Sequence, residues 1–238
     1  MLIAEAARLA AIEVLSPTAT NAAGEGFPTI ARGNVFDSRA AALADLNDRL
    51  AYTPTLALYT ASARAITRAD AAAEDDRDCE TILEAVAELS VAAKDTDGEF
   101  ADAMAGSDPE ARLVLAGLCG QVEFALMRSE AGYLFRRLIL GVRRVEYEPF
   151  ALPHLGLRWQ RTTMRFVLGL PDDRHDIEAG GLPEPMRSFA AALPEASYAK
   201  AKLTELAGYF AGEQRDPLHL ITIAPPGGTP IASADLEG

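Results

Sequence analysis

The sequence predicts an α+β protein: an antiparallel or mixed sheet of four to five strands with helices packed on one face, plus a mostly helical C-terminal extension. Apolar residues recur at helical spacing over 2–15 and 107–128, and they alternate with polar residues over 157–168. Hydrophobic residues make up 49% of the 238 residues. A chain of this kind can bury a sizeable core, which argues against disorder of the whole.

The first predicted elements are a helix and a loop. Over 2–15 the apolar residues repeat at steps of three and four, which predicts an amphipathic helix that ends at Ser16-Pro17. Residues 17–29 contain Asn21, two glycines and Pro28, and we expect a loop there.

Strands are expected next. A short strand is predicted over 30–37, around Ile30, Val35 and Phe36. A stronger one is predicted over 55–60, because the preceding Pro54 fits the first position of a strand.

Residues 79–93 carry two conflicting signals. Glu80, Glu84 and Glu88 recur every four residues, and the composition favours a helix. Apolar residues also alternate from Leu83 to Val91, as in a strand. Because the neighbouring strands need a partner, we predict a strand.

Residues 107–128 predict the clearest helix. Ser107 and Glu110 have the spacing of a capping box, and Pro109 fits the first turn. One apolar stripe is expected to pack on the sheet, and it consists of Leu113, Ala116, Gly120, Phe124 and Met127.

Residues 141–150 and 157–168 read as a strand pair joined by a turn at 152–156. In the second strand Phe166 and its apolar neighbours alternate with Arg161 and Arg165.

The composition changes after Pro171, which predicts a domain boundary. Residues 1–170 form the predicted α+β domain, and 171–238 form a C-terminal extension. Within the extension we expect helices near 184–192 and 195–211, a strand over 218–223 and a frayed tail. A chain cut after Leu170 is then expected to stay soluble and folded.

The charge is strongly divided along the chain. The net charge of −13 argues against general binding to nucleic acid, which needs clustered Lys and Arg. Residues 68–110 hold 14 acidic and 3 basic residues, whereas 111–170 hold 4 acidic residues and 9 arginines. The first segment therefore has a net charge of −11 and the second of +5. Such segments suit solvated faces, and they also suit a subunit whose two faces meet different neighbours.

Catalytic and metal-binding groups are weakly indicated. Cys79 and Cys119 have neither a disulfide framework nor a metal spacing, and Cys119 fits a buried position. A cysteine paired with His154, His175 or His219 would be a nucleophile with its base, but no catalytic signature surrounds either cysteine. The cluster Asp172, Asp173, His175 and Asp176 fits a solvated loop better than a metal site. We therefore expect no enzyme activity, no cofactor and no metal, in a soluble chain made inside the cell without a membrane span.

Seven arginines are the candidate site residues. One interpretation is the solvated polar face of a sheet, and the other is a basic rim that meets an acidic protein neighbour. Exclusive use of arginine favours the second, because the guanidinium fork suits protein interfaces. The residues are Arg136, Arg137, Arg143, Arg144, Arg158, Arg161 and Arg165.

The order of these pieces resembles a known family. The pieces are the first helix, Phe36-Asp37-Ser38-Arg39, the strand from Pro54 to Tyr59, the acidic-flanked strand 80–91, the helix 108–128 and the basic hairpin 142–150 and 157–168. In that order they resemble the tail terminator proteins of long-tailed bacteriophages, the family of minor tail protein U. The resemblance covers about residues 1–170.

The resemblance implies a structural virion protein. Such a subunit assembles into a homo-oligomeric ring, expected to be a hexamer, that caps the tail tube at its head-proximal end and stops its polymerisation. The implied partners are the tail tube protein, a head-completion or neck protein and the end of the tape measure protein, with assembly in the host cytoplasm.

Two other functions stay open. Another head–tail connector, neck or baseplate protein would share a soluble ring-forming subunit. A small enzyme or ligand-binding domain would need a deep pocket with a paired catalytic group.

Overall fold

The computed structural model describes residues 2–47, 52–67, 77–95, 98–103, 109–150, 153–154, 157–158, 161–176, 180–210, 220–223 and 232–235. The helices are α1 (Leu2–Leu15), α2 (Thr18–Ala23), the 3-10 helix η1 (Leu43–Asp45), α3 (Pro109–Met127), α4 (Tyr133–Arg136), α5 (Met186–Ala192) and α6 (Tyr198–Gly208). The strands are β1 (Val35–Asp37), β2 (Thr53–Thr67), β3 (Arg77–Asp95), β4 (Gly98–Ala103), β5 (Gly141–Phe150), β6 (Pro153–His154), β7 (Leu157–Arg158), β8 (Arg161–Leu170), β9 (Leu220–Ile223) and β10 (Ala232–Asp235).

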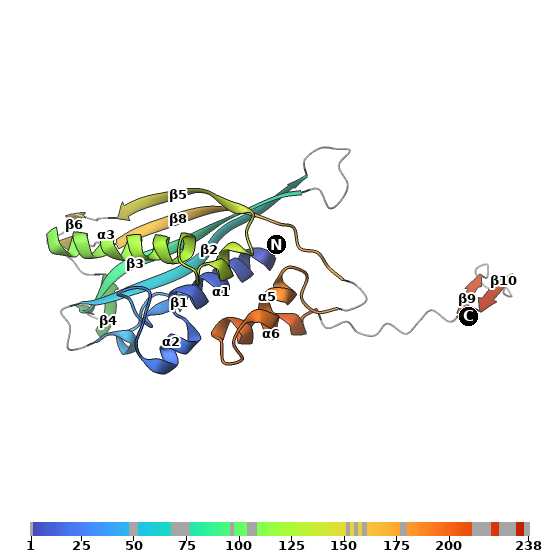
Figure 1. Ribbon diagram of the computed structural model, residues 1–238, viewed down its shortest axis with the longest axis horizontal. Helices are drawn as coiled ribbons and strands as arrows, with labels where there is room; N and C mark the ends of the chain where they lie inside the picture. The colour runs from blue at the N-terminus through green and yellow to red at the C-terminus, as the bar shows by residue number, and fades with distance from the viewer. Residues whose placement is uncertain are drawn as a thin grey trace.

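One mixed sheet organises the molecule (Figure 1). Its strands follow the order β1-β2-β3-β8-β5, and β4 pairs with the end of β3. Only β1 and β2 run parallel, while the other neighbours are antiparallel. Helices α1 and α3 pack against the sheet, and the predicted α+β class is confirmed.

Strand β3 resolves the ambiguous segment, and the strand prediction is confirmed. It pairs with β2 on one side and β8 on the other, so tertiary context overrides the local helix preference. Leu83 and Leu89 lie buried on the helix-covered face. Glu84 and Glu88 lie on the opposite face, because positions an even number apart share one face of a strand.

Helix α3 was predicted correctly in extent, but its predicted buried face is wrong. Leu113 is 73% exposed and Phe124 is 59% exposed. The buried stripe consists of Ala111, Leu115, Leu118, Cys119, Val122, Ala125 and Leu126. The helix carries two apolar stripes, and the buried one contains no glycine and packs over β3 and β8. Ser107 of the capping box lies outside the described residues.

Helix α1 lies at the centre of the core. Five of its eleven buried residues are alanines, so neighbouring elements can approach it closely, and larger side chains such as Ile3 and Leu15 fill the core around it. Its N-terminus is capped from far along the chain. The carboxylate of Asp173 accepts hydrogen bonds from the backbone N–H of Leu2 at 2.7 Å and of Ile3 at 2.9 Å.

The described residues 182–207 pack into the same core as those before Leu170. Helices α5 and α6 confirm the expected helices, and their Met186, Phe189 and Leu203 are fully buried in one cluster with α1 and the sheet. This packing favours one core for the described residues up to 210. The division into 1–170 and 171–238 stays a prediction.

Two local elements differ from the sequence expectation. Residues 17–29, expected as a loop, contain α2, because the carboxylate of Glu13 accepts hydrogen bonds from Thr18 N and Oγ1 at its start. Gly24, with φ of 75°, ends this helix in the left-handed conformation. Strand β9 confirms the last expected strand, and it pairs antiparallel with the unpredicted β10.

Candidate assembly surface

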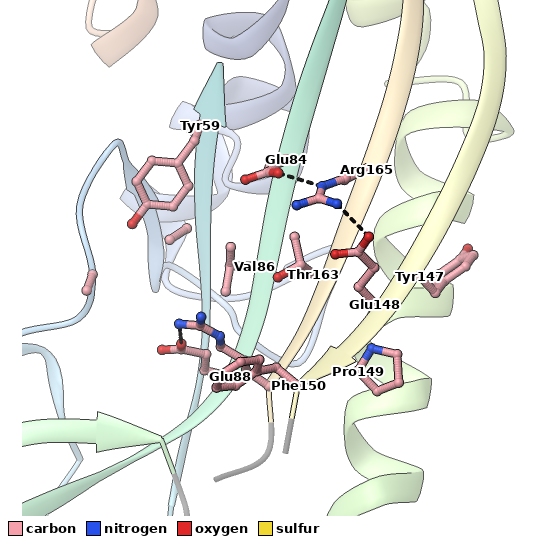
Figure 2. A pocket seen from close by; sticks show the side chains of 13 residues that line it. Tyr59, Glu84, Val86, Glu88, Tyr147, Glu148, Pro149, Phe150, Thr163 and Arg165 are labelled. Atoms are coloured by element: carbon pink, nitrogen blue, oxygen red, sulfur yellow. Dashed lines mark hydrogen bonds and ion pairs between the residues drawn. The ribbon is translucent and has the colours of Figure 1, made fainter. Parts of the chain in front are cut away.

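The sheet face opposite α1 and α3 carries a polar groove of about 770 Å³ (Figure 2). Side chains from β2, β3, β5 and β8 line it. They are Ala57, Tyr59, Glu84, Val86, Glu88, Tyr147, Glu148, Pro149, Phe150, Arg161, Thr163 and Arg165, and Ala40 completes the lining. Partial burial is the main cause that raises the pKa of Tyr59, and the negative charge of Glu88 raises it further.

Arg165 holds three strands together across this groove. In the sheet register it lies opposite Glu84 of β3, and its Nε donates to Oε1 of Glu84 at 2.7 Å. Its Nη1 reaches Glu148 of β5 at 2.5 Å. The hydrogen bond with Glu84 is the main reason that the pKa of Arg165 is raised. This arginine is therefore neutralised by two carboxylates of its own chain.

Arg161 is less completely paired. It lies opposite Glu88 in the register, but the distance from its Nη1 to Glu88 Oε1 is 3.8 Å. Its guanidinium stacks over the ring of Phe150, with 4.6 Å between the guanidinium carbon and the ring centroid. Its Nε is buried and finds no hydrogen-bond acceptor among the described residues. Arg161 therefore carries a buried donor that the described part of its own chain leaves unsatisfied, while its side chain as a whole is 42% exposed.

A second ion-pair cluster lies further along the sheet. Glu80 of β3 pairs with Arg64 at 2.6 Å and with Arg143 at 2.5 Å. Arg143 sits at a bulge in β5 and reaches across β8, where a Cβ at Gly169 would lie 3.5 Å from its Nε.

The other candidate arginines play separate parts. Arg144 pairs with Glu146 at 2.9 Å on the exposed edge strand, and Arg137 donates to the carbonyl of Ser188. The side chain of Arg158, on β7, lies outside the described residues.

The side chain of Arg136 contacts the C-terminal end of α3. It donates to the carbonyls of Leu126 and Ser129, both at 2.9 Å, and so satisfies acceptors at the end of α3. This contact gives it a role in the fold.

The acidic and basic segments therefore meet within one subunit. Glu80, Glu84 and Glu88 of the acidic segment pair with arginines of the basic segment, instead of forming separate patches. The sequence interpretation missed these carboxylate partners. The sequence did contain a sign of this pairing. A spacing of four residues places the three glutamates on one face of a strand, as it does on one face of a helix. An interface role for the remaining arginines stays a prediction.

The Phe36–Arg39 motif forms a second charged feature. Arg39 stacks over Phe36 at 4.0 Å and pairs with Asp45 at 2.7 Å, and the hydrogen bond from Arg39 lowers the pKa of Asp45. Asp37 lies 3.1 Å from Arg8 Nε and accepts a hydrogen bond from Tyr198 at 2.9 Å. The motif thereby connects β1 to α1 and α6, beside a groove of about 640 Å³.

The cysteines do not have the surroundings of reactive thiols. Burial raises the pKa of Cys119 to about 11. Cys79 is 2% exposed and lies against Asp172, and burial raises its pKa also. Across the part of the chain that the structure describes, no three His, Cys, Asp or Glu side chains gather as a metal site.

Comparisons with known proteins add no assignment. A scan against protein-family models and a search of curated proteins find no match to this chain. Within the described residues, no helix has the length and apolar character needed to cross a membrane.

Proposed function

We propose that this chain is a structural subunit of a bacteriophage tail, a tail terminator that forms a ring on the end of the tail tube and stops its growth. The order of sequence motifs supports this proposal, and its implied α+β fold agrees with the architecture. The observation that carries it is the sheet face opposite α1 and α3, which offers an open groove lined by charged side chains. Such a surface suits a protein partner better than a small substrate, which usually binds in a largely apolar pocket.

The groove is suited to recognition by polar contacts. Its charged side chains are mostly held in place by ion pairs, so little side-chain entropy is lost when a partner binds. The side chain of Arg161 is 42% exposed, and Tyr59 and Phe150 supply aromatic surface beside it. Arginine and aromatic residues are enriched at protein interfaces. We infer that the groove is one of the two patches that a single-component ring requires.

A tube-growth assay tests the proposal. Tail tube protein of the same phage would be polymerised with and without the purified chain, and the products imaged by negative-stain electron microscopy. We expect a ring of density at one tube end and shorter tubes as the ratio of chain to tube protein rises. Tubes with bare ends and unchanged lengths would contradict the proposal. Binding to another tail part without capping would favour a neck or baseplate protein.

A further inference from the structure

Helix α3 lies on the outside of the molecule (Figure 1). Its outer face carries an exposed apolar stripe. Leu113 and Phe124 are 73% and 59% exposed, and Gly117 and Gly120 lie between them, also exposed. At 3.6 residues per turn these four positions lie within roughly 60° of one another around the helix axis. They point away from the buried stripe, and no described residue of this subunit covers them.

The two glycines are not required by the fold of the subunit. A Cβ built at either position meets no atom within 4 Å, and neither glycine has a positive φ. Glycine disfavours a helix more than any residue except proline. Two glycines in the middle of a helix, with open space in front of them, would allow the backbone of another molecule to approach this helix closely.

The stripe is symmetric about its centre. Its spacing is four, three and four residues, so it reads the same from either end of the helix. Two copies of α3 packed antiparallel about a two-fold axis would place Gly117 against Gly120 of the second copy. The same register places Leu113 against Phe124.

The flanking charges select the antiparallel arrangement. Exposed Glu110 and Arg128 lie on the same side of the stripe at opposite ends of α3. The antiparallel register brings Glu110 of each copy beside Arg128 of the other, and on the other side it brings Arg112 toward Glu123. A parallel pair would bring like charges together at both ends, which is unfavourable.

We propose that a second copy of this chain docks on the outer stripe of α3, forming a two-fold antiparallel helix pair centred between Gly117 and Gly120. This contact goes beyond the proposed tail function and does not depend on it. An isologous contact cannot by itself close a six-fold ring, so it would pair free subunits or two rings. One helix pair buries less than the ~800 Å² per partner of a standard interface, and we expect a dissociation constant on the order of 10 µM.

Sedimentation velocity of the full chain, across a concentration series, tests the contact. The wild type should shift from the 25.3 kDa monomer to a dimer. Gly120→Glu should weaken dimerisation by at least about 30-fold, since it fills the centre of the contact. The subunit should still fold, because the Cβ position is open and Glu favours a helix.

Gly208→Glu is the matched control. It makes the same change at an exposed glycine of α6, where a Cβ also meets no atom within 4 Å, and it should dimerise like the wild type. Circular dichroism of both variants checks that the fold is retained. A wild type that stays monomeric up to about 200 µM, or a Gly120→Glu variant that dimerises normally, would overturn the proposal.

A charge swap tests the register. Glu110→Arg and Arg128→Glu should each weaken the dimer about threefold, and the double variant should restore it. Absence of rescue would overturn the antiparallel arrangement. Because these measurements use the chain alone, their failure leaves the tube-capping proposal to its own assay. If the free chain forms rings, Gly120→Glu should abolish only the pairing of rings.

Discussion

The two faces of the sheet are built by alternate residues of the same strands, yet they are stabilised by different interactions. On β8, Phe166 is buried beneath the helices while its neighbour Arg165 lies in the groove. The covered face gains from burial of apolar area, and the open face is held by cross-strand ion pairs in water. The covered face therefore sets the stability of the subunit. Residues of the open face contribute less to stability, so they can be chosen for contact with a partner.

The largest expected effect comes from cutting the chain after Leu170. The cut removes Asp173 from the start of α1 and strips away Phe189, Leu203 and the other buried side chains of α5 and α6. We expect the free energy of unfolding to fall by more than about 4 kcal/mol, or the product to be insoluble. The measurement is urea denaturation of both chains. A truncated chain as stable as the full one would uphold the predicted boundary instead.

Phe166→Ala against Thr163→Ala compares the two faces of one strand. Phe166 is fully buried, so its truncation should cost about 3–5 kcal/mol. Thr163 lines the groove, and its loss should change the free energy of unfolding by less than about 0.5 kcal/mol. Chemical denaturation of the two variants measures both values. Similar costs at the two sites would mean that the open face is part of the stabilising core.

Asp173→Ala should have an intermediate effect. The substitution leaves the N–H groups of Leu2 and Ile3 without their carboxylate acceptor, and a lost helix cap costs about 1 kcal/mol. Thermal unfolding followed by circular dichroism should show a lower midpoint. Asp173→Asn keeps an acceptor and should recover part of the loss. Equal losses in both variants would show that the charge matters more than the hydrogen bonds.

The smallest expected effect is a pH dependence at Tyr147. Burial, and then a hydrogen bond to Glu123, raises the pKa of this phenol to about 12. The unfolded chain ionises near ~10, so the stabilisation is present below pH ~10 and is lost as the pH rises through about 12. Tyr147→Phe should flatten this part of the curve of unfolding free energy against pH. An unchanged curve would mean that Tyr147 titrates alike in both states.

The elements that could be predicted from the sequence are those that bury apolar residues on the helix-covered face. Periodic apolar residues identified α1, α3 and β8, while β3 was predicted as a strand because the neighbouring strands need a partner. Burial acts on each strand independently, so its pattern is visible along the chain.

The errors arose where pairing in space decides the outcome. Arg165 reads as a free cation in the sequence because its partners Glu84 and Glu148 lie on two other strands. The outer stripe of α3 has the same helical spacing as the buried one, and only the packed sheet shows which faces inward. Asp173 reads as part of a charged linker, because its contact with α1 spans 171 residues.

The most direct test of the central claim, that the open sheet face is an assembly surface, is tube capping by the double variant Arg161→Glu and Arg165→Glu. A control variant, Arg174→Glu with Lys202→Glu, makes the same charge change at exposed positions away from the groove. The control should unfold near the wild-type midpoint, whereas the groove variant should unfold cooperatively at a lower midpoint, since each new glutamate lies directly opposite a glutamate of β3. We predict that the control still caps tubes in electron micrographs and that the groove variant leaves tube ends bare. Normal capping by a folded groove variant would contradict the account.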